Sequence, residues 1–301
     1  MTALDGFLLA AGLGTRMGQL SEALPKPAWT VAGRSLLQWS AEAFRAEGFT
    51  RLACNAHLHP ERLREAAVDI EVFEEPVLLG SAGGLLHARD RAGDALLTWN
   101  ADILASDVPF AALKAAHLAS GADLTWLLVP HPGGPWTKVW LDAEGRVLRA
   151  GEGEGPYLFT GAACWSPSAL ALLPEGPSEV RDLLPRLPLH RGLVVEALPW
   201  REVGTPDALI AAASELALEQ EGRLPGCYLH PSSTPGPGAE SRFRRCILGP
   251  RAAPPPAAQD HDAFWFGSAD GTQVRLNLPL SLQPPASLGE CMHSPRPMGS
   301  L

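Results

Sequence analysis

The sequence predicts an α/β fold in which a Rossmann-like, mixed and mainly parallel sheet carries helices on both faces. Short apolar runs alternate with stretches of helical periodicity along residues 7–73, the pattern of a parallel sheet with crossover helices. A glycine-rich turn follows the first apolar run, and an aspartate follows a later one. Ligands of such sheets bind at the carboxyl ends of the strands, where both features are expected.

Composition limits the class of protein. The 301 residues suggest one large domain, or one domain and a smaller one. The formal net charge of −9 argues against a nucleic acid or an anionic membrane as a partner. The first residues carry no basic segment, so we expect neither a signal peptide nor a membrane span. Five cysteines without a C-x-x-C spacing indicate free thiols, which predicts a cytoplasmic protein.

The first element is the apolar run FLLAA at 7–11, which is short enough to be a buried strand. The turn G-L-G-T follows at 12–15, and its glycines leave backbone N–H groups free to face an anion. Arg16 and Lys26 add full positive charges, and a proline on each side of Lys26 stiffens its loop. We therefore predict a strand that ends in a phosphate-binding turn. Its G-x-G-x-x-x-G spacing matches neither the dinucleotide fingerprint nor the P-loop.

Helix and strand patterns then alternate. A helical pattern runs from Ser35 to a stop at Gly48, and the following elements are a strand, a helix that starts with proline, and a strand, at 51–55, from 60 and at 69–73. The small-residue segment LGSAGGL follows at 79–85 and leads into a helix expected over 85–92. Small side chains would let a flat ring approach the backbone, and the alternative is glycine packing at a helix entry.

Two acidic residues follow apolar runs later in the chain. Asp102 lies in the run at 95–104, where a hard oxygen ligand at the sheet edge suits Mg²⁺ held together with substrate phosphates. Glu202 follows a strand expected at 193–199 and precedes a helix that Thr205 and Pro206 begin. The structural alternatives are a cap or turn for Asp102 and a solvated strand end for Glu202. The elements between them are a strand, a hairpin and a strand, at 122–129, 138–149 and 157–165.

The combined motifs resemble those of the sugar-1-phosphate nucleotidyltransferases, also called nucleotide-sugar pyrophosphorylases. The first block is A-A-G-L-G-T-R-M, P-K-P and V-A-G-R-S-L-L, within residues 10–37. The later segments follow in the order of that family: LGSAGGL, NADIL, YLFTG and WREVGTP. The resemblance covers roughly residues 4–217. It implies the nucleotidyltransferase fold of glycosyltransferase A type.

The resemblance also implies roles for individual residues. Arg16 and Lys26 would be catalytic, and Asp102 and Glu202 would hold Mg²⁺, with Glu202 in the place of the family's aspartate. The sugar-binding residues would be Asn100, Thr160 and Gly161. The nucleotide-binding residues would be Ala10, Ala11, Gly12, Gly14, Thr15 and Arg16 in the first loop, and Gly80, Ala82 and Gly83 in the second.

The implied reaction joins an NTP to a sugar 1-phosphate and releases pyrophosphate. Three departures bear on it: Ala101 for the family's glycine, Glu202, and a GEGEG segment at 151–155 where many relatives have the lysine of E-K-P. The last departure favours a branch like the N-acetylmuramate 1-phosphate uridylyltransferases, and a branch like the mannose-1-phosphate guanylyltransferases is retained. Two alternatives stay open: a cytidylyltransferase-like enzyme for a non-sugar phosphate, and a catalytically silent regulatory protein that binds nucleotide sugars. Homo-oligomerisation also stays open.

A shift in composition marks a second region. Proline and glycine dominate beyond Gly222, with short apolar pieces between them. We predict a nucleotidyltransferase domain at 1–218 and a Pro/Gly-rich region at 219–301. This region resembles a degenerate left-handed β-helix with a disordered end, and the alternative is a partly ordered tail.

Overall fold

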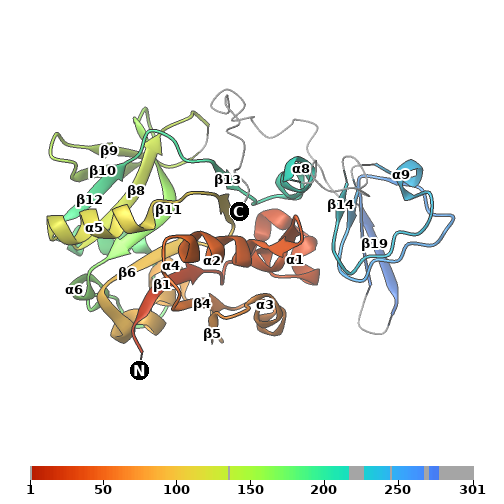
Figure 1. Ribbon diagram of the computed structural model, residues 1–301, viewed down its shortest axis with the longest axis horizontal. Helices are drawn as coiled ribbons and strands as arrows, with labels where there is room; N and C mark the ends of the chain where they lie inside the picture. Colours follow the sequence, from red (N-terminus) through yellow and green to blue (C-terminus); the bar gives the residue numbers. More distant parts are fainter. Residues whose placement is uncertain (1, 135, 217–226, 245, 268–270, 278–301) are drawn as a thin grey trace.

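The computed structural model describes residues 2–134, 136–216, 227–244, 246–267 and 271–277. A central sheet with helices around it is built from the first two segments, and a smaller group of strands is built from the others (Figure 1). The expected disordered end of the chain and residues 219–226 lie outside the described residues.

The centre of the main sheet is parallel and carries the predicted site. β1 (Leu4–Leu9) pairs in parallel with β4 (Leu52–Ala56) on one side and with β6 (Ala92–Asn100) on the other. β4 pairs in parallel with β5 (Glu71–Glu74). The carboxyl ends of these four strands therefore meet at one edge of the sheet, as the sequence predicts.

The other half of the sheet is largely antiparallel. β11 (Tyr157–Trp165) runs antiparallel to β6, β8 (Leu124–Pro130) and β9 (Lys138–Leu141). The edges are completed by β10 (Val147–Gly151), antiparallel to β9, and β12 (His190–Val194), parallel to β8. The predicted mixed α/β sheet is confirmed.

Helices cover both faces because side chains alternate along the strands. Leu8 packs in one core cluster with residues of α2 (Leu36–Ala46) and α5 (Phe110–Ser120). Its neighbour Phe7 packs in the other cluster, with residues of α6 (Pro167–Leu170) and α7 (Val180–Leu183). The remaining helices of this part are α1 (Leu20–Ala23), α3 (Pro60–Ala66), α4 (Gly80–Gly83) and α8 (Pro206–Leu216).

α2 shows how local sequence sets a boundary. The Ser35 hydroxyl accepts from the Gln38 N–H at 3.1 Å, and the Gln38 side chain accepts from the Ser35 N–H at 3.1 Å. This reciprocal capping box satisfies two N–H groups that the first helical turn leaves unpaired. The predicted helix start is therefore confirmed.

Three expected elements differ in detail. The helix expected over 85–92 is a 3-10 helix, Gly84–Arg91, directly after α4. The strand expected at 95–104 is two strands, because the chain turns at 101–102 between β6 and β7 (Ile103–Ala105). The strand expected at 193–199 lies instead at His190–Val194, where it pairs with β8. The second difference arises at the candidate site, because Asp102 lies in that turn.

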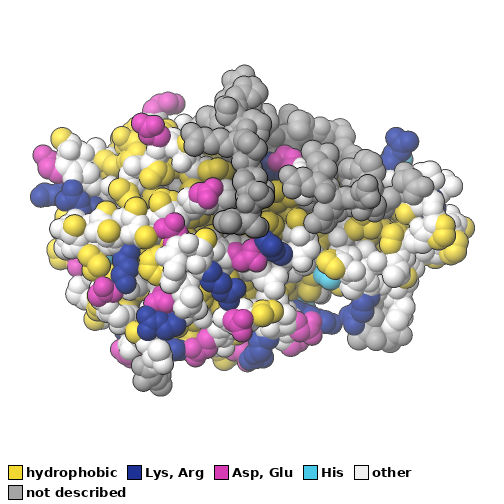
Figure 2. All heavy atoms as spheres, in the orientation of Figure 1, with side chains coloured by type: hydrophobic (Ala, Val, Ile, Leu, Met, Phe, Trp, Pro, Cys, Tyr) yellow, Lys and Arg dark blue, Asp and Glu magenta, His cyan; other side chains and the backbone are white. Residues whose placement is uncertain are grey.

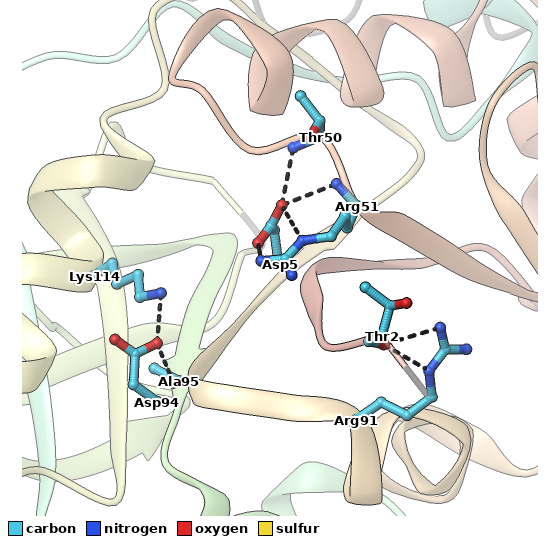
Figure 3. Close-up of polar contacts among 8 residues, drawn as sticks. All are labelled: Thr2, Asp5, Thr50, Arg51, Arg91, Asp94, Ala95 and Lys114. Atoms are coloured by element: carbon cyan, nitrogen blue, oxygen red, sulfur yellow. Dashed lines mark hydrogen bonds and ion pairs between the residues drawn. The ribbon is translucent and has the colours of Figure 1, made fainter.

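Ion pairs lie at the amino ends of β1 and β6, and their side chains are drawn in Figure 3. These ends are at the edge of the sheet opposite the carboxyl ends of the strands. Asp5 of β1 accepts from the backbone and the guanidinium of Arg51, which precedes β4. Asp94 of β6 accepts from Lys114 of α5, with Nζ 2.6 Å from Oδ1. The Asp5 contacts tie the start of β1 to the residue before β4, and the Asp94 contact ties the start of β6 to α5.

The C-terminal strands form a stack of parallel pairs. β14 (Tyr228–Leu229), β16 (Ile247–Leu248) and β18 (Ala263–Gly267) pair in parallel in that order, with Tyr228 opposite Ile247 and Ile247 opposite Phe264. β19 (Gln273–Asn277) runs antiparallel to β18. A second parallel pair joins β15 (Phe243–Arg244) to β17 (Asp260–His261), beside α9 (Ala239–Arg242). Parallel pairing of successive segments is typical of the stacked coils of a β-helix. The left-handed β-helix and the boundary at residue 218 stay predictions.

An aromatic cluster joins the C-terminal strands to the main domain. The Trp29 ring contacts the Tyr228 ring at 5.4 Å and the Phe264 ring at 5.9 Å between centroids, both edge to face. The Tyr228 hydroxyl lies 2.8 Å from the Thr30 hydroxyl. All three rings are buried, and β14 lies beside α8 (Figure 1). The two regions therefore share one core.

The described surface carries charges of both signs, and the described cysteines lie in the interior. Acidic and basic side chains are interspersed on the face that Figure 2 shows. Among the described residues, no helix combines the length and the apolar character that a membrane crossing requires. The four cysteines in the described part of the chain are buried thiols.

Candidate active site

The glycine turn lies at the carboxyl end of β1. Gly14 adopts a φ of 64°, and a Cβ there would lie 2.9 Å from the Ser21 hydroxyl, which donates to the Gly14 carbonyl. Glycine is required because both the backbone conformation and the close hydroxyl disfavour a side chain. Gly12 is exposed, and a Cβ on it would meet nothing within 4 Å. A side chain is therefore excluded at Gly14, and the backbone at Gly12 is open to a ligand.

Lys26 reaches this edge from the proline-flanked loop. Its side chain is only 11% exposed, and Nζ lies 2.5 Å from Asp102 Oδ2 and 4.0 Å from Glu202 Oε1. The Arg16 guanidinium forms an ion pair with Glu202. Two cations and two carboxylates that are far apart in the sequence thus form one group of charges.

Strand pairing brings the two carboxylates together. β7 runs antiparallel to β13 (Trp200–Glu202), with Ile103 opposite Glu202. The Val203 N–H donates to the Asp102 carbonyl at 2.9 Å. At Gly204 a Cβ would lie 2.8 Å from Glu202 Oε1 and 3.1 Å from the Arg16 guanidinium carbon. The glycine of the WREVGTP segment therefore leaves room for the Arg16–Glu202 pair.

The charges of Glu202 and Arg16 stabilise each other. Burial raises the pKa of Glu202, but the Arg16 hydrogen bond and charge, the Lys26 charge and a hydrogen bond from Trp136 together hold its pKa below the ordinary value. The hydrogen bond to Glu202 raises the pKa of Arg16. Both groups are therefore charged at neutral pH.

A cavity of about 130 Å³ adjoins these charges and is lined by Gly14, Thr15, Arg16, Lys26 and Gly204. It collects the glycine turn and both predicted catalytic cations. A larger cavity of about 610 Å³ lies between α1, α3 and the C-terminal strands, and no predicted site residue lines it. We take the smaller cavity as the candidate site because chemistry requires the charged groups that converge there.

The two carboxylates fit a divalent cation. Both lie within 4.0 Å of one cationic atom, Lys26 Nζ, so their oxygens already face a common positive charge. Mg²⁺ sites in nucleotide enzymes use one or two carboxylates together with substrate phosphates. Among the described residues, no group of three or more histidine, cysteine or acidic side chains could hold a metal by itself. The other ligands would have to be phosphate or water oxygens.

The second glycine loop is packed closely against the protein. A Cβ on Gly80 would lie 2.6 Å from the Ser178 carbonyl oxygen, and one on Gly83 would lie 2.6 Å from the Gly176 carbonyl oxygen. The N–H groups of Ala82 and Gly83 both donate to Ser178. This geometry favours the glycine-packing alternative for these positions. Nucleotide contact by Gly80, Ala82 and Gly83 stays a prediction.

Asn55 occupies the N–H groups of Ala10 and Ala11. Its Oδ1 accepts from them at 2.7 and 3.3 Å. Contacts of these two alanines with a nucleotide would have to use their carbonyl groups or methyl groups, and that role stays a prediction. Asn55 is the penultimate residue of β4 and Glu75 follows β5, and neither was among the predicted site residues. The available signal was a polar residue at the carboxyl end of a buried strand.

The predicted sugar-binding residues lie together beside Asp102. Gly161 has a φ of 96°, and a Cβ on it would lie 3.1 Å from the Asn100 amide nitrogen. Thr160 is fully buried, and its hydroxyl donates to the Leu127 carbonyl at 2.9 Å. Trp200 donates to the Thr160 carbonyl at 2.7 Å. The Thr160 hydroxyl is therefore used inside the sheet, and sugar binding at this cluster stays a prediction.

One aromatic residue near the carboxylates was also missed. The Trp136 ring contacts the Trp200 ring edge to face, 5.7 Å between centroids. It lies in the loop between β8 and β9 and donates to Glu202. Its place follows from tertiary packing, because no motif in the loop marks it.

The fold is that of the nucleotidyltransferases. HddC from Yersinia pseudotuberculosis, solved in complex with GMP-PN, superposes with a TM-score of 0.62 at 19% identity over 70% of this chain and 99% of that one. A putative glucose-1-phosphate thymidylyltransferase from Bacillus anthracis gives 0.61 at 17% identity, over 73% and 98%. The inositol-1-phosphate CTP transferase from T. maritima gives 0.59 at 16% identity, over 73% and 99%. At these identities the likeness concerns the fold.

Within that class, the chain belongs to the family with a MobA-like NTP transferase domain, whose sequence model matches residues 6–189. The N-acetylmuramate alpha-1-phosphate uridylyltransferase of Caulobacter vibrioides is 31% identical over 235 residues, which cover 70% of this chain and 96% of that protein. Probable mannose-1-phosphate guanylyltransferase 1 of Oryza sativa subsp. japonica is 27% identical over 224 residues. That match covers 67% of this chain and only 62% of the rice protein. The predicted resemblance to sugar-1-phosphate nucleotidyltransferases is confirmed.

Proposed function

We propose that this protein is a sugar-1-phosphate nucleotidyltransferase. It would combine an NTP with a sugar 1-phosphate to give an NDP-sugar and pyrophosphate. The observation that supports this most directly is the convergence of Arg16 and Lys26 with Asp102 and Glu202 beside the glycine turn. A substrate with several phosphates needs cations that neutralise its charge. If a metal ion binds with those phosphates, carboxylates are needed to hold the metal.

The proposed reaction is a direct displacement. An oxygen of the sugar phosphate attacks the α-phosphorus of the NTP, and the bond from that phosphorus to the pyrophosphate oxygen breaks. No protein nucleophile is required, so the chain would contribute position and charge. Gly12, Gly14 and Thr15 would hold the triphosphate. Arg16 would bind the leaving β- and γ-phosphates, and Lys26 would neutralise charge at the α-phosphate.

Asp102 and Glu202 would hold Mg²⁺, which when bound supplies Lewis-acid stabilisation to phosphate oxygens. Glu202 is one methylene longer than the aspartate usual in the family, so its backbone must sit farther from the ion. In the present arrangement the two carboxylates are paired with Lys26 and Arg16. Substrate binding would therefore require both cations to exchange a carboxylate for a phosphate.

The same pairing supports a second candidate, a catalytically silent protein that binds nucleotide sugars. In such a protein the Arg16–Glu202 pair would persist and the metal would not bind. A third candidate, transfer to a non-sugar phosphate, is kept because the T. maritima structural neighbour is named for inositol 1-phosphate. We also propose a cytoplasmic location, on the support of the four described cysteines, which are buried thiols.

Pyrophosphate release by the purified full chain distinguishes these candidates. We would test each NTP with Mg²⁺ against a panel that includes N-acetylmuramate 1-phosphate, mannose 1-phosphate and inositol 1-phosphate. Release with one NTP and one sugar 1-phosphate is expected and would name both substrates. Release only with inositol phosphate would support the third candidate. NTP or NDP-sugar binding without release would support the silent protein.

Lys26→Ala tests the assignment of the catalytic lysine. We expect kcat to fall by about 10²–10³, because one charge that stabilises the transition state is removed. Lys114→Ala is the matched control: Lys114 also donates to an aspartate, at 2.6 Å against 2.5 Å for Lys26, but it lies at the opposite edge of the sheet (Figure 3). Its kcat should stay at the wild-type value. A folded Lys26→Ala enzyme with wild-type kcat would refute the assignment.

A further inference from the structure

A continuous chain of hydrogen bonds links the two glycine loops through the interior of the protein. It begins at the N–H groups of Ala10 and Ala11 and ends at the N–H group of Leu79, the residue before α4. The two side chains between them are Asn55 and Glu75, which are 3% and 2% exposed. Neither side chain takes part in the chemistry proposed above.

We propose that Asn55 and Glu75 are a positioning pair that holds the phosphate-binding turn and the loop at 79–84 in the relative placement that nucleotide binding needs. The proposal rests on the proposed function, because it assigns the nucleotide to the space that these two loops border. It makes Asn55 and Glu75 determinants of nucleotide affinity that do not touch the reacting atoms.

The Asn55 amide has only one orientation that satisfies its neighbours. Its Oδ1 faces two N–H donors, those of Ala10 and Ala11. Its Nδ2 donates to Glu75 Oε1 at 2.7 Å. A rotated amide would place the NH₂ group against the two backbone donors and its oxygen against a carboxylate oxygen. The turn after β1 is therefore hydrogen-bonded to β4 through an amide group that has a fixed orientation.

Glu75 carries the link to the second loop. Its Oε2 accepts from the Leu79 N–H at 3.0 Å, and its own N–H donates to the Ala56 carbonyl at 2.7 Å. Among the described residues no lysine or arginine forms an ion pair with Glu75, so amide groups alone satisfy this buried side chain. Burial of a carboxyl group without a cation is unfavourable. Stability alone therefore does not account for a glutamate at this position.

Gly84 packs closely against both Asn55 and Glu75. A Cβ on Gly84 would lie 2.4 Å from the Asn55 amide nitrogen and 3.0 Å from Glu75 Oε1. Gly84 is buried and lies immediately after α4. The second loop thus contacts both members of the pair, once through the Leu79 N–H and once through the bare backbone of Gly84. A shift of either side chain would move that loop relative to the turn.

The order of donors and acceptors along these hydrogen bonds makes a decisive double variant possible. Asn55→Asp places two carboxylates against each other. Glu75→Gln brings a new NH₂ group against either the Asn55 NH₂ group or the Leu79 N–H, so that two donors face each other. In the combination Asn55→Asp/Glu75→Gln, the new aspartate accepts from the Ala10 and Ala11 N–H groups and from the glutamine NH₂. The glutamine oxygen then accepts from the Leu79 N–H. Every donor regains an acceptor, with the same total charge and almost the same volume.

The test is the dissociation constant of the cognate NTP with Mg²⁺, measured by calorimetry on the full chain without sugar phosphate. Each single variant should weaken binding by about tenfold to a hundredfold, the effect expected from one mispaired buried polar group. The double variant should return to within about threefold of wild type. The KM of the sugar 1-phosphate should change less than the dissociation constant of the NTP.

Thr125→Val is the matched control for a purely structural effect. The Thr125 hydroxyl lies 2.9 Å from His117 Nδ1 in another buried polar pair, away from both loops. Its removal should lower the unfolding midpoint and leave the NTP dissociation constant unchanged. If the single variants at Asn55 and Glu75 behave like Thr125→Val, or if the double variant does not recover NTP affinity, the proposal is overturned.

A milder variant covers the case in which the single changes prevent folding. Glu75→Asp keeps two acceptor oxygens but draws them back from the Leu79 N–H, so NTP binding should weaken by about threefold to tenfold. Unchanged NTP affinity in folded Glu75→Asp would also overturn the proposal. A folded wild-type chain that binds no NTP would instead refute the proposed function, and this inference with it.

Discussion

Single ionisable residues behave in opposite ways in this protein, depending on their partners. Glu202 is partly buried but faces Arg16 and Lys26, so it keeps its charge. His190 is largely buried against the Trp126 ring, 4.2 Å between centroids, and among the described residues its Nε2 has no hydrogen-bond partner. Burial lowers the pKa of His190 to about 4. The cause in each case is the balance of desolvation against nearby charge.

His190 should make stability depend on pH. Its folded pKa of about 4 lies below the ordinary value of 6.5, so its contribution is complete above pH 6.5 and is lost as pH falls toward 4. Between pH 7.5 and 5.0, the free energy of unfolding should fall by about 1–2 kcal/mol more in wild type than in His190→Leu. Urea denaturation of both proteins at both pH values measures this. Parallel losses in the two proteins would exclude His190 as the cause.

At the scale of elements, close backbone contacts explain why small residues gather around the site. α4 is pressed against the segment at 176–179, in which the Ser178 carbonyl accepts from the N–H groups of Ala82 and Gly83. Gly83 has ordinary helical backbone angles, so space alone requires a glycine there. The LGSAGGL segment therefore reports a packing contact between two parts of the main domain.

Gly83→Ala tests that contact. The added Cβ would lie 2.6 Å from the Gly176 carbonyl oxygen, so the two segments must separate, at a cost of about 1–3 kcal/mol in the free energy of unfolding. Gly93→Ala in β6 is the control, because its Cβ would meet only the Ala3 methyl at 3.8 Å. Chemical denaturation should show a change of at most about 0.5 kcal/mol for that control. Equal stability of the two variants would argue against a tight α4 contact.

For the molecule as a whole, the C-terminal strands are part of the main core. Tyr228, Ile247 and Phe264 pack in the same cluster as residues of β1, α2 and α8. Trp29 lies three residues after Lys26, the proposed catalytic lysine. The rings of Tyr228 and Phe264 cover Trp29, which is fully buried. The loop that carries Lys26 is therefore supported from the C-terminal side.

Substitution of Tyr228 measures how strongly the two regions are joined. Tyr228→Ala should lower the free energy of unfolding by about 3–5 kcal/mol, because a buried ring is lost next to Trp29 and Phe264. Tyr228→Phe should cost about 0.5–1.5 kcal/mol, since it loses only the hydroxyl contact with Thr30. Trp fluorescence and circular dichroism should report one common transition. Two separate transitions in the wild-type chain would contradict a shared core.

Features that depend on neighbours in the chain were predictable from the sequence. The start of α2 was predictable because it depends on Ser35 and Gln38, which are three residues apart and cap each other. A strand before the glycine turn was predictable as well, because FLLAA has the apolar character of a buried strand, although the strand runs over Leu4–Leu9 and not over 7–11. The edge at which the glycine turn and Asp102 lie followed from the rule that parallel strands share their carboxyl ends. Lys26 and Glu202 were assigned to the same site by the resemblance of their motifs to those of the family, and Glu202 reaches it through the antiparallel pairing of β13 with β7. Motif order then indicated the family.

Features that depend on strand order and side-chain orientation were not predictable in this way. The Asn55–Glu75 pair exists because β4 and β5 are adjacent to β1, and hydrophobic periodicity does not encode which strands are neighbours. The contact of Gly83 with Gly176 and that of Tyr228 with Trp29 join segments far apart in sequence. Such contacts depend on how whole elements pack around two cores. Local sequence therefore specifies the elements and their charged ends, whereas long-range packing specifies which polar groups meet between them.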